Sequence, residues 1–316
     1  MKQNLKRITI EDIDDLTSII SDFVLTSKGK PQILLPKEQI HKALLANVIN
    51  VFALYEQGDQ AIGFVITRKA KTDPNHGYIF LLHIHSIYKN SDTLENYEYK
   101  LFDAAFAHLK SCSSINIEHQ ALSDALGDYI VSKGFRKIDR AEMSIGRSQI
   151  ISLVEPFLPS EYSIISWETN MVSSVAKLIV DFNAKTMDGE LFPYFREINR
   201  CENFIQELMN NPNTKFKDRH VKVLKQNNKF IGVCFLIITS SNTGSIPEFG
   251  ISPIYQRKGL GRALLIHSLI QFFKTEPSID SVTLDVTMDN IAALKLYNSL
   301  GFHHKRKYSV FILRRA

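Results

Sequence analysis

The sequence has few of the features that mark membrane, secreted or metal-binding proteins. Its three cysteines, Cys112, Cys201 and Cys234, stand far apart, so no two of them have the short spacing of a metal-binding loop or a redox dithiol. The longest apolar run, residues 230–238, is far shorter than the roughly 20 residues that a membrane-spanning helix needs. We therefore expect a cytoplasmic protein that keeps its thiols reduced and has no membrane partner.

Targeting and metal-binding patterns are missing as well. The basic N-terminal residues are interrupted by acids within residues 11–15 before an apolar stretch could form, which is unlike a signal peptide. His220, His267, His303 and His304 have no metal-ligand spacing with carboxylates or cysteines. We expect a mature chain that starts near its first residue and holds no metal.

The composition is that of an ordinary folded protein. The hydrophobic share is 44% and the charged share 22%, which excludes disordered, collagenous and coiled-coil classes for the whole chain. The 38 basic and 33 acidic residues give a net charge of +5, too diffuse to predict a nucleic-acid partner. A length of 316 residues suggests about two domains.

The two halves of the chain show the same order of patterns. A strand, a polar turn and a second strand occur at 51–67 and again at 221–239, and both second strands carry a glycine, Gly63 and Gly232, after an isoleucine. Each half later has a helix that ends in Gly-Phe. The sequence therefore predicts an internal repeat of about 150 residues.

The segment between the halves contains two prolines and no helical period, so we place the domain junction there. We expect one domain at 1–147, a linker at 148–159 and a second domain at 160–316. Strands alternate with helices in each half, which predicts an α/β unit with one mixed sheet and helices on its faces. A single large α/β domain is the alternative.

A glycine-bearing turn follows the strand predicted near residue 250 and leads directly into an amphipathic helix. Gly259 and Gly261 allow the backbone to approach an anion, and the start of the helix offers unpaired N–H groups with a partial positive charge. A dinucleotide fingerprint would need a third glycine where Leu264 stands, and a P-loop would need Gly-Lys-Ser/Thr. The turn is a candidate phosphate site, and a plain charged surface turn is the alternative.

At this turn the sequence resembles the GCN5-related N-acetyltransferase (GNAT) superfamily, whose acetyl-CoA loop reads Gln/Arg-x-x-Gly-x-Gly/Ala and is matched by residues 256–261. A later block of the family, Asn-x-x-Ala followed by Tyr-x-x-x-Gly-Phe, is matched from Asn290 to Phe302. The resemblance covers 160–316 as a complete domain and 1–147 as a degenerate copy. It implies two tandem GNAT folds, each a mixed, mostly antiparallel sheet flanked by helices.

The resemblance also implies the binding site of acetyl-CoA, the acyl donor of the family. In the family the fourth strand separates from its neighbour, which leaves the Ile251 N–H free for the acetyl oxygen. Gly250 is a candidate bulge position for that separation. The residues that the resemblance assigns to acetyl-CoA are Phe249, Gly250, Ile251, Gln256, Arg257, Lys258, Gly259, Leu260, Gly261, Arg262 and Asn290.

Transfer of the acetyl group to an amine needs a base for the ammonium proton and an acid for the thiolate. An alkyl ammonium has a pKa near 10.4, so some group must accept its proton. Carboxylates acting through water can do this, and Glu248 and Asp285 are the candidates. Tyr297 is the candidate acid, since a phenol is still protonated at neutral pH. The alternatives are a solvent-facing role for either carboxylate and a core role for the tyrosine.

The N-terminal copy lacks these features. When the halves are aligned, residues 89–94 replace the phosphate loop without either glycine and with an added aspartate, Asp92. Ile130 stands at the position of Tyr297. We expect that residues 1–147 do not bind acetyl-CoA.

The sequence thus predicts an N-acetyltransferase that moves an acetyl group by direct transfer to a primary amine on a small molecule or peptide. We expect a monomer or a weak homodimer. Candidate acceptor contacts are the aromatic residues Trp167, Phe192, Tyr194 and Phe195. A non-catalytic acyl-CoA-binding or regulatory module is the alternative function.

Overall fold

The computed structural model describes residues 4–26, 37–56, 60–70, 73–89, 91, 93–117, 122–212 and 214–315. The chain forms two compact units, one of residues 1–139 with 308–316 and one of residues 140–307. Within the described residues, no helix is both long enough and apolar enough to cross a membrane.

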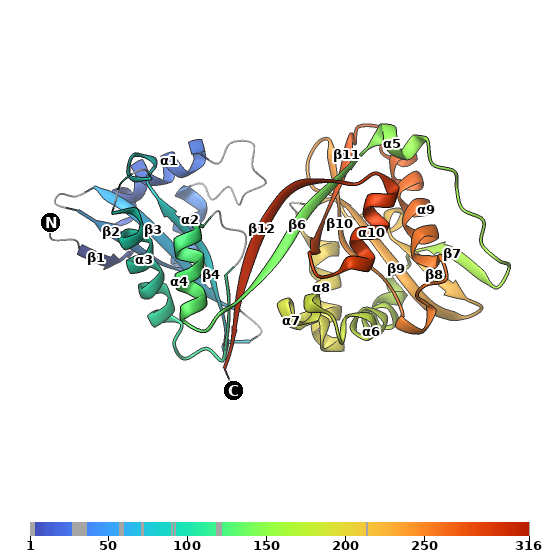
Figure 1. Cartoon of the computed structure of the whole chain (residues 1–316), viewed down its shortest axis with the longest axis horizontal. Helices are drawn as coiled ribbons and strands as arrows, with labels where there is room; N and C mark the ends of the chain where they lie inside the picture. Colours follow the sequence, from blue (N-terminus) through green and yellow to red (C-terminus); the bar gives the residue numbers. More distant parts are fainter. Residues whose placement is uncertain are drawn as a thin grey trace. The chain divides into compact units, whose positions relative to one another are not determined.

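The first unit is a mixed sheet with helices on both faces (Figure 1). Its strand order is β1-β2-β3-β4-β5-β12, and all neighbouring pairs are antiparallel except β4 with β5. Helices α1 and α2 pack on one face and α3 and α4 on the other. The elements that begin in this unit are β1 (Asn4–Arg7), α1 (Thr17–Thr26), α2 (Lys37–Leu45), β2 (Asn50–Tyr55), β3 (Ala61–Lys69), β4 (His76–Ile84), α3 (Leu94–His108), β5 (Ser114–Ile117), α4 (Asp124–Ser132) and β6 (Arg136–Gly146).

The second unit repeats this plan. Its strand order is β6-β11-β10-β9-β8-β7, with a parallel pair only between β10 and β11. The elements that begin in it are α5 (Arg147–Ile151), β7 (Tyr162–Ser166), α6 (Val172–Asn183), α7 (Met187–Leu191), α8 (Ile198–Asn210), β8 (Lys222–Gln226), β9 (Lys229–Ile238), β10 (Thr243–Ile251), α9 (Leu260–Thr275), β11 (Ser281–Thr287), α10 (Ile291–Leu300) and β12 (His303–Arg314).

Strand β9 shows why this unit carries helices on both faces. Val233 and Phe235 pack against α6 and α8, whereas Cys234 and Leu236 pack against α9 and its neighbours. Side chains alternate between the faces of a strand, so an almost continuous apolar run needs a cover on each side. The predicted fold class, an α/β architecture with mixed, mostly antiparallel sheets, is confirmed.

The compact units do not coincide with the halves read from the sequence. Residues 140–146 of β6 pair with β11 and so belong to the second unit, although they lie before the predicted junction. Residues 311–314 of β12 pair with β5 in the first unit. The predicted division is 1–147, 148–159 and 160–316. Residues 140–146 fall in its first domain but form the edge strand of the second unit, and residues 311–314 fall in its second domain but form the edge strand of the first unit.

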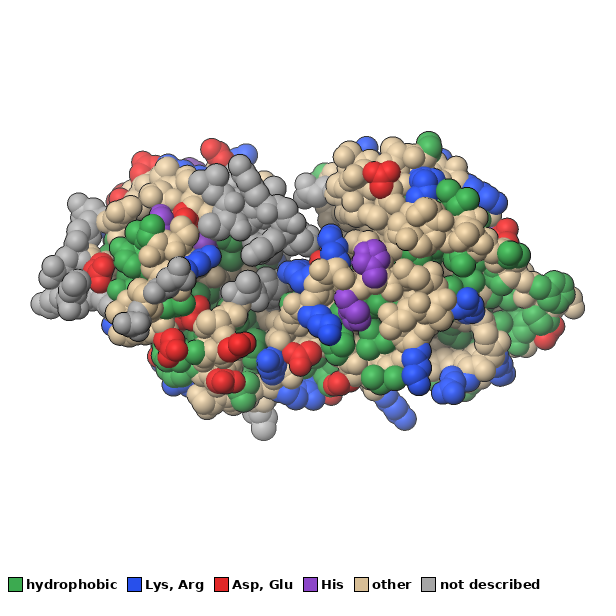
Figure 2. Space-filling model, turned by 45° about the horizontal axis from the view of Figure 1, so that its top comes forward, with side chains coloured by type: hydrophobic (Ala, Val, Ile, Leu, Met, Phe, Trp, Pro, Cys, Tyr) green, Lys and Arg blue, Asp and Glu red, His purple; other side chains and the backbone are tan. Residues whose placement is uncertain are grey.

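The segment between α5 and β7 is only partly covered. Leu153 and Leu158 pack against the core below α9, but Val154 is 84% exposed and Phe157 is 90% exposed. Hydrophobic side chains are visible at the right-hand end of the molecule in Figure 2, where this segment runs. The prediction of a linker that packs on a domain therefore holds for Ile150, Leu153 and Leu158, and not for Val154 and Phe157.

Candidate active site

The site begins where strand β10 separates from β11. The two strands pair in parallel only over residues 243–246 and 281–284, and beyond that point β10 pairs with β9 alone. The register of β10 against β9 shifts between Ser245 and Glu248, a stretch that contains Pro247, which has no N–H to donate. The predicted separation is confirmed, but the predicted bulge at Gly250 is wrong, because Gly250 pairs in register with Val233.

The open edge of β10 offers backbone groups that β9 does not use. The Ser252 N–H donates to the Ile231 carbonyl at 2.8 Å, on the β9 side. Successive residues of an antiparallel strand direct their N–H groups to opposite edges, so the Ile251 N–H faces the open edge. The Ile251 carbonyl faces the same way and accepts a hydrogen bond of 2.9 Å from Nε2 of Gln256.

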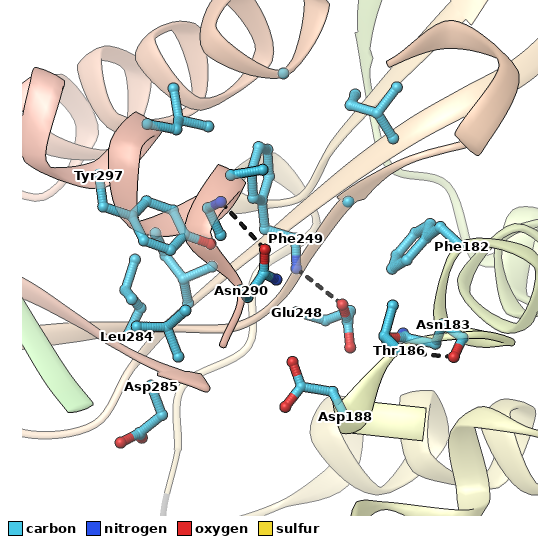
Figure 3. A pocket seen from close by; sticks show the side chains of 18 of the residues that line it. Phe182, Asn183, Thr186, Asp188, Glu248, Phe249, Leu284, Asp285, Asn290 and Tyr297 are labelled. Atoms are coloured by element: carbon cyan, nitrogen blue, oxygen red, sulfur yellow. Dashed lines mark hydrogen bonds between the residues drawn. The ribbon is translucent and has the colours of Figure 1, made fainter. Parts of the chain in front are cut away.

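Gly250 serves a close approach and not a bulge. A Cβ at this position would lie 2.4 Å from Cε2 of Phe182, a distance that real side chains do not reach. The absence of a side chain lets the Phe182 ring of α6 lie against the β10 backbone. This ring forms part of the pocket wall opposite α10 (Figure 3).

The candidate phosphate loop turns from β10 into α9 through two left-handed residues. Arg257 has φ +64° and Gly259, the N-cap of α9, has φ +78°. The N–H groups of residues 260–262 come at the start of the helix, where no intrahelical acceptor exists. The loop thus has the free donors and the positive helix end that an anion needs.

A pocket of about 390 Å³ joins the open edge, the loop and α10, a volume typical of small-molecule sites. All the predicted site residues line it except Lys258 and Leu260. The Lys258 ammonium lies 5.4 Å from the ring centre of Tyr255, and Leu260 is buried in the core beneath α9. For these two residues, the prediction of a contact with acetyl-CoA now concerns their backbone atoms only.

Glu248 is a buried carboxyl at the centre of the pocket. Its side chain lies on β10, and the residue is 8% exposed. Burial raises the pKa of Glu248 to about 8, and the nearby Asp188 carboxylate adds to the rise, while a 3.1 Å hydrogen bond from the Phe249 N–H opposes it. A group with this pKa can hold or release a proton near neutral pH, as a general base must.

Tyr297 faces the same pocket from α10. The residue is 7% exposed, and burial raises its pKa, so the phenol keeps its proton at neutral pH. Its ring lies 6.4 Å from that of Phe249, measured between centres. The predicted cap of α10 is confirmed, because the Asn290 side chain accepts a hydrogen bond of 3.2 Å from the Ala293 N–H.

Asp285 differs from Glu248 in its surroundings. It lies on β11 opposite Glu142 of β6 and is exposed. Its carboxylate points away from Glu248 and Tyr297 (Figure 3). The two candidate bases are therefore unequal, and Glu248 is the one that shares the buried space with the tyrosine.

Several pocket residues were not foreseen from the sequence. Asn183, Thr186 and Asp188 come from the corner between α6 and α7, and Arg140 comes from β6. A threonine followed by acids is a helix-start pattern and could have located Thr186, which caps α7 by accepting from the Gly189 N–H at 3.1 Å.

Two of the four predicted aromatic contacts line the pocket. Phe192 and Phe195 do so, whereas Trp167 and Tyr194 pack in the core on the α6 and α8 face of the sheet. Among the described residues, no group of three or more His, Cys, Asp or Glu side chains is arranged to hold a metal ion.

The first unit keeps the strand geometry but differs at the matching positions. Among the described residues, β4 pairs with β5 only over 76–79 and 114–117. Ile130 is buried where α10 carries the tyrosine, and Ser123, the cap of α4, donates to the buried Glu98 carboxyl. Asn90 and Asp92 of the loop lie outside the described residues.

An open strand edge, a glycine loop at a helix start and a capped helix bearing a buried tyrosine are together the arrangement that the resemblance to the GNAT superfamily implies. Residues 186–302 match the family model "Acetyltransferase (GNAT) family". The likeness to this family concerns that part of the chain, which lies within the second unit.

Among the curated proteins, the chain is similar to the [ribosomal protein bS18]-alanine N-acetyltransferase of Escherichia coli, with 43% identity over 56 residues. The corresponding protein of Salmonella typhimurium matches with the same identity over the same length. The matched segment is 18% of this chain, and it spans about a third, 36%, of the length of those relatives.

Solved structures share the fold over nearly the whole chain. A GCN5-related N-acetyltransferase from Sphaerobacter thermophilus has a TM-score of 0.67 at 12% identity and covers 98% of this chain and 95% of its own. A tandem GNAT protein from the clavulanic acid biosynthesis pathway has a TM-score of 0.64 at 10% identity, with 98% of each chain covered. At these identities the likeness concerns the fold alone.

Proposed function

We propose that this protein is an acetyl-CoA-dependent N-acetyltransferase whose chemistry takes place in the second unit. The observation that carries the proposal is one pocket that combines a free strand edge at Ile251, the left-handed loop at Gly259 and the two buried groups Glu248 and Tyr297. Binding alone would not need a buried base and a buried acid in the same space.

The residues fit acetyl-CoA by the chemistry of their donors. The N–H groups of the loop and of the first turn of α9 would hold the pyrophosphate, and the Ile251 N–H would hold the acetyl oxygen. Arg257 and Arg262 line the same pocket and add positive charge. Bound acetyl-CoA supplies the acetyl group as an activated thioester.

Glu248 and Tyr297 would move the protons. The ionised Glu248 carboxylate takes the proton from the acceptor ammonium, which frees the nitrogen lone pair for attack on the acetyl carbon. As the carbon–sulfur bond breaks, the Tyr297 hydroxyl gives its proton to the thiolate, and the nitrogen passes its surplus proton to the Tyr297 phenolate as the amide forms. The Ile251 N–H stabilises the oxyanion, and the products are an amide and a free thiol.

The acceptor is a primary amine on a small molecule or peptide. The relatives named above act, by their names, on an alanine of a ribosomal protein. We therefore include a peptide α-amine with an N-terminal alanine among the acceptors to test, beside small amines. The protein acts in the cytoplasm in this proposal, as a monomer or weak homodimer.

We further propose that the first unit does not bind acetyl-CoA. Glu98 and Ser123 satisfy one another at the helix start that corresponds to Asn290, and Ile130 offers no proton. Its role is then to support the second unit.

The test is a titration with acetyl-CoA followed by an acceptor screen. Calorimetry is expected to give one site per chain, and mixing with acceptors is expected to release free thiol and yield an acetylated amine by mass. Two sites would overturn the proposal for the first unit. Binding with no transfer to any acceptor would favour the alternative, a non-catalytic acyl-CoA-binding module.

A further inference from the structure

The acceptor end of the pocket is shaped by the corner between α6 and α7. The Thr186 hydroxyl lies 3.1 Å from the main-chain oxygen and from Oδ1 of Asn183, and it accepts from the Gly189 N–H. These contacts fix both ends of the short connection. As a result Asn183 and Asp188 approach Glu248 from the same corner (Figure 3).

Asp188 is held by one of its oxygens and leaves the other unused. Its Oδ1 accepts from Nη1 of Arg140 at 2.5 Å and from Oγ1 of Thr287 at 3.1 Å. Within the described residues Oδ2 has no hydrogen-bond partner, and the side chain, 26% exposed, lines the pocket. Arg140 is 6% exposed and is already engaged by Asp188 and Thr287.

The charged groups that face Glu248 leave this cluster short of one cation. Asp188 of α7 and Arg140 of β6 face it as charged groups. The remaining titratable groups near it are Tyr297 of α10 and two thiols, Cys201 of α8 and Cys234 of β9. Burial raises the pKa of both thiols to about 12, so all three stay neutral. With Glu248 ionised, the cluster therefore carries a net negative charge.

The remaining wall is mostly aromatic, and Asn183 and Thr186 complete it. Phe182, Phe192 and Phe195 line this end of the pocket. An ammonium can lie against aromatic rings, whereas a carboxylate cannot find a donor there. Charge and wall therefore favour a cation and disfavour an anion in the same place.

We propose that Glu248 and Asp188 form an ammonium clamp that selects acceptors whose reactive amine has no carboxylate beside it. The clamp rests on the proposed function and narrows its substrate class: it accepts a cationic primary amine and rejects a free α-amino acid. An α-carboxylate would stand next to both acids, and the guanidinium that faces Glu248, Arg140, is already bound to Asp188.

The binding experiment uses the full chain with coenzyme A and the matched pair alaninamide and alanine. Alaninamide is expected to raise the thermal transition of the complex, and alanine to leave it unchanged. Equal shifts with both would overturn the clamp. Alanyl peptides beside alaninamide distinguish a peptide source of the amine from a small-molecule source.

The kinetic experiment uses the ratio of kcat/KM for alaninamide to that for alanine. In Asp188→Asn the ratio is expected to fall by about tenfold relative to the unaltered protein, because like-charge repulsion is removed. Comparison of ratios cancels the different basicity of the two amines. Glu190→Gln, which removes a charge from the same helix outside the pocket, is the control and should keep the ratio.

The pH profile separates this role from a structural one. Removal of the Asp188 charge is expected to move the acidic limb of kcat/KM to lower pH, since that charge raises the pKa of Glu248. An unchanged ratio and an unchanged limb would overturn the clamp. Selective binding of alaninamide without any transfer would support the clamp and contradict the proposed function. Equal transfer to both acceptors would support the proposed function and contradict the clamp.

Discussion

The side-chain amide of Gln256 donates a hydrogen bond of 2.9 Å to the main-chain oxygen of Ile251. Gln256 opens the phosphate loop, and Ile251 ends the strand with the free edge. This one contact fixes the loop against the strand. The two ends of the proposed acetyl-CoA site are therefore held in one rigid corner.

Gly261 gives a test of the loop that does not disturb the fold. A Cβ here would lie 3.5 Å from Cγ1 of Ile251 and 3.6 Å from Cζ of Phe249, which are ordinary contacts. Gly261→Glu places a negative charge at the start of α9 and is expected to weaken acetyl-CoA binding about 100-fold by calorimetry. Gly261→Ala is the control and should bind normally. Equal affinity of the two variants would contradict a phosphate site.

The activity should depend on pH through Glu248. The base must be ionised, and the pKa of Glu248 is raised by burial to about 8. We expect kcat/KM to rise with pH up to a limb near that value. Glu248→Gln should lose the limb and about 10²–10⁴ of the rate. A profile that keeps its limb in this variant would assign the base elsewhere, with Asp285 the next residue to change.

The same carboxyl should make stability depend on pH in an unusual direction. Its pKa is about 8 in the folded protein against the ordinary 4.5, so the folded state binds the proton more tightly between these values. The contribution of Glu248 is full below the lower value and is lost as the pH rises through the upper one. Glu248→Gln stays neutral, so its melting temperature relative to the unaltered protein should increase between about pH 5 and about pH 9. A constant difference would contradict the raised pKa.

Tyr297→Phe tests the acid without removing the ring. The ring packs near Phe249 and Phe302, and phenylalanine preserves both contacts. We expect kcat to fall about 100-fold while acetyl-CoA binding remains, because only the proton donor is lost. Stopped-flow thiol detection with matched calorimetry separates the two quantities. An unchanged kcat would show that Tyr297 is a core residue and not the acid.

Gly250→Ala tests the close packing against the aromatic wall. The added methyl would overlap the Phe182 ring, whose nearest atom lies 2.4 Å from the Cβ position. We expect a loss of about 1–3 kcal/mol in the free energy of unfolding and a higher KM for the amine. Gly261→Ala, with ordinary contacts, serves again as the control. Full stability in Gly250→Ala would show that Phe182 can move without cost.

The parts of the site that follow from local sequence could be predicted. The loop around Gly259 and the cap at Asn290 depend on residues next to one another, so their patterns are visible in the chain itself. Glu248 could be named as a candidate because strand alternation places it on the same face as Gly250 and Ser252. That Glu248 is buried and Asp285 exposed could be known only from the positions of the neighbouring strands.

Long-range features could not be predicted in the same way. Arg140 meets Asp188 across 48 residues of sequence, and no local pattern links them. The bulge lies around Pro247 and not at Gly250, because a glycine can serve a bulge or a close approach and the sequence does not distinguish them. The strand pattern of β12 is the same whichever sheet it joins.

The exchange of edge strands has a consequence for synthesis on the ribosome. Residues 140–307 contain every strand of the second unit, but the sheet that starts with β1 gains its last strand only from residues 311–314. Translation runs from the N-terminus, so the unit whose residues emerge first cannot close its sheet until residues 311–314 have been made. The order in which the two units are completed is thus the reverse of the order in which they begin.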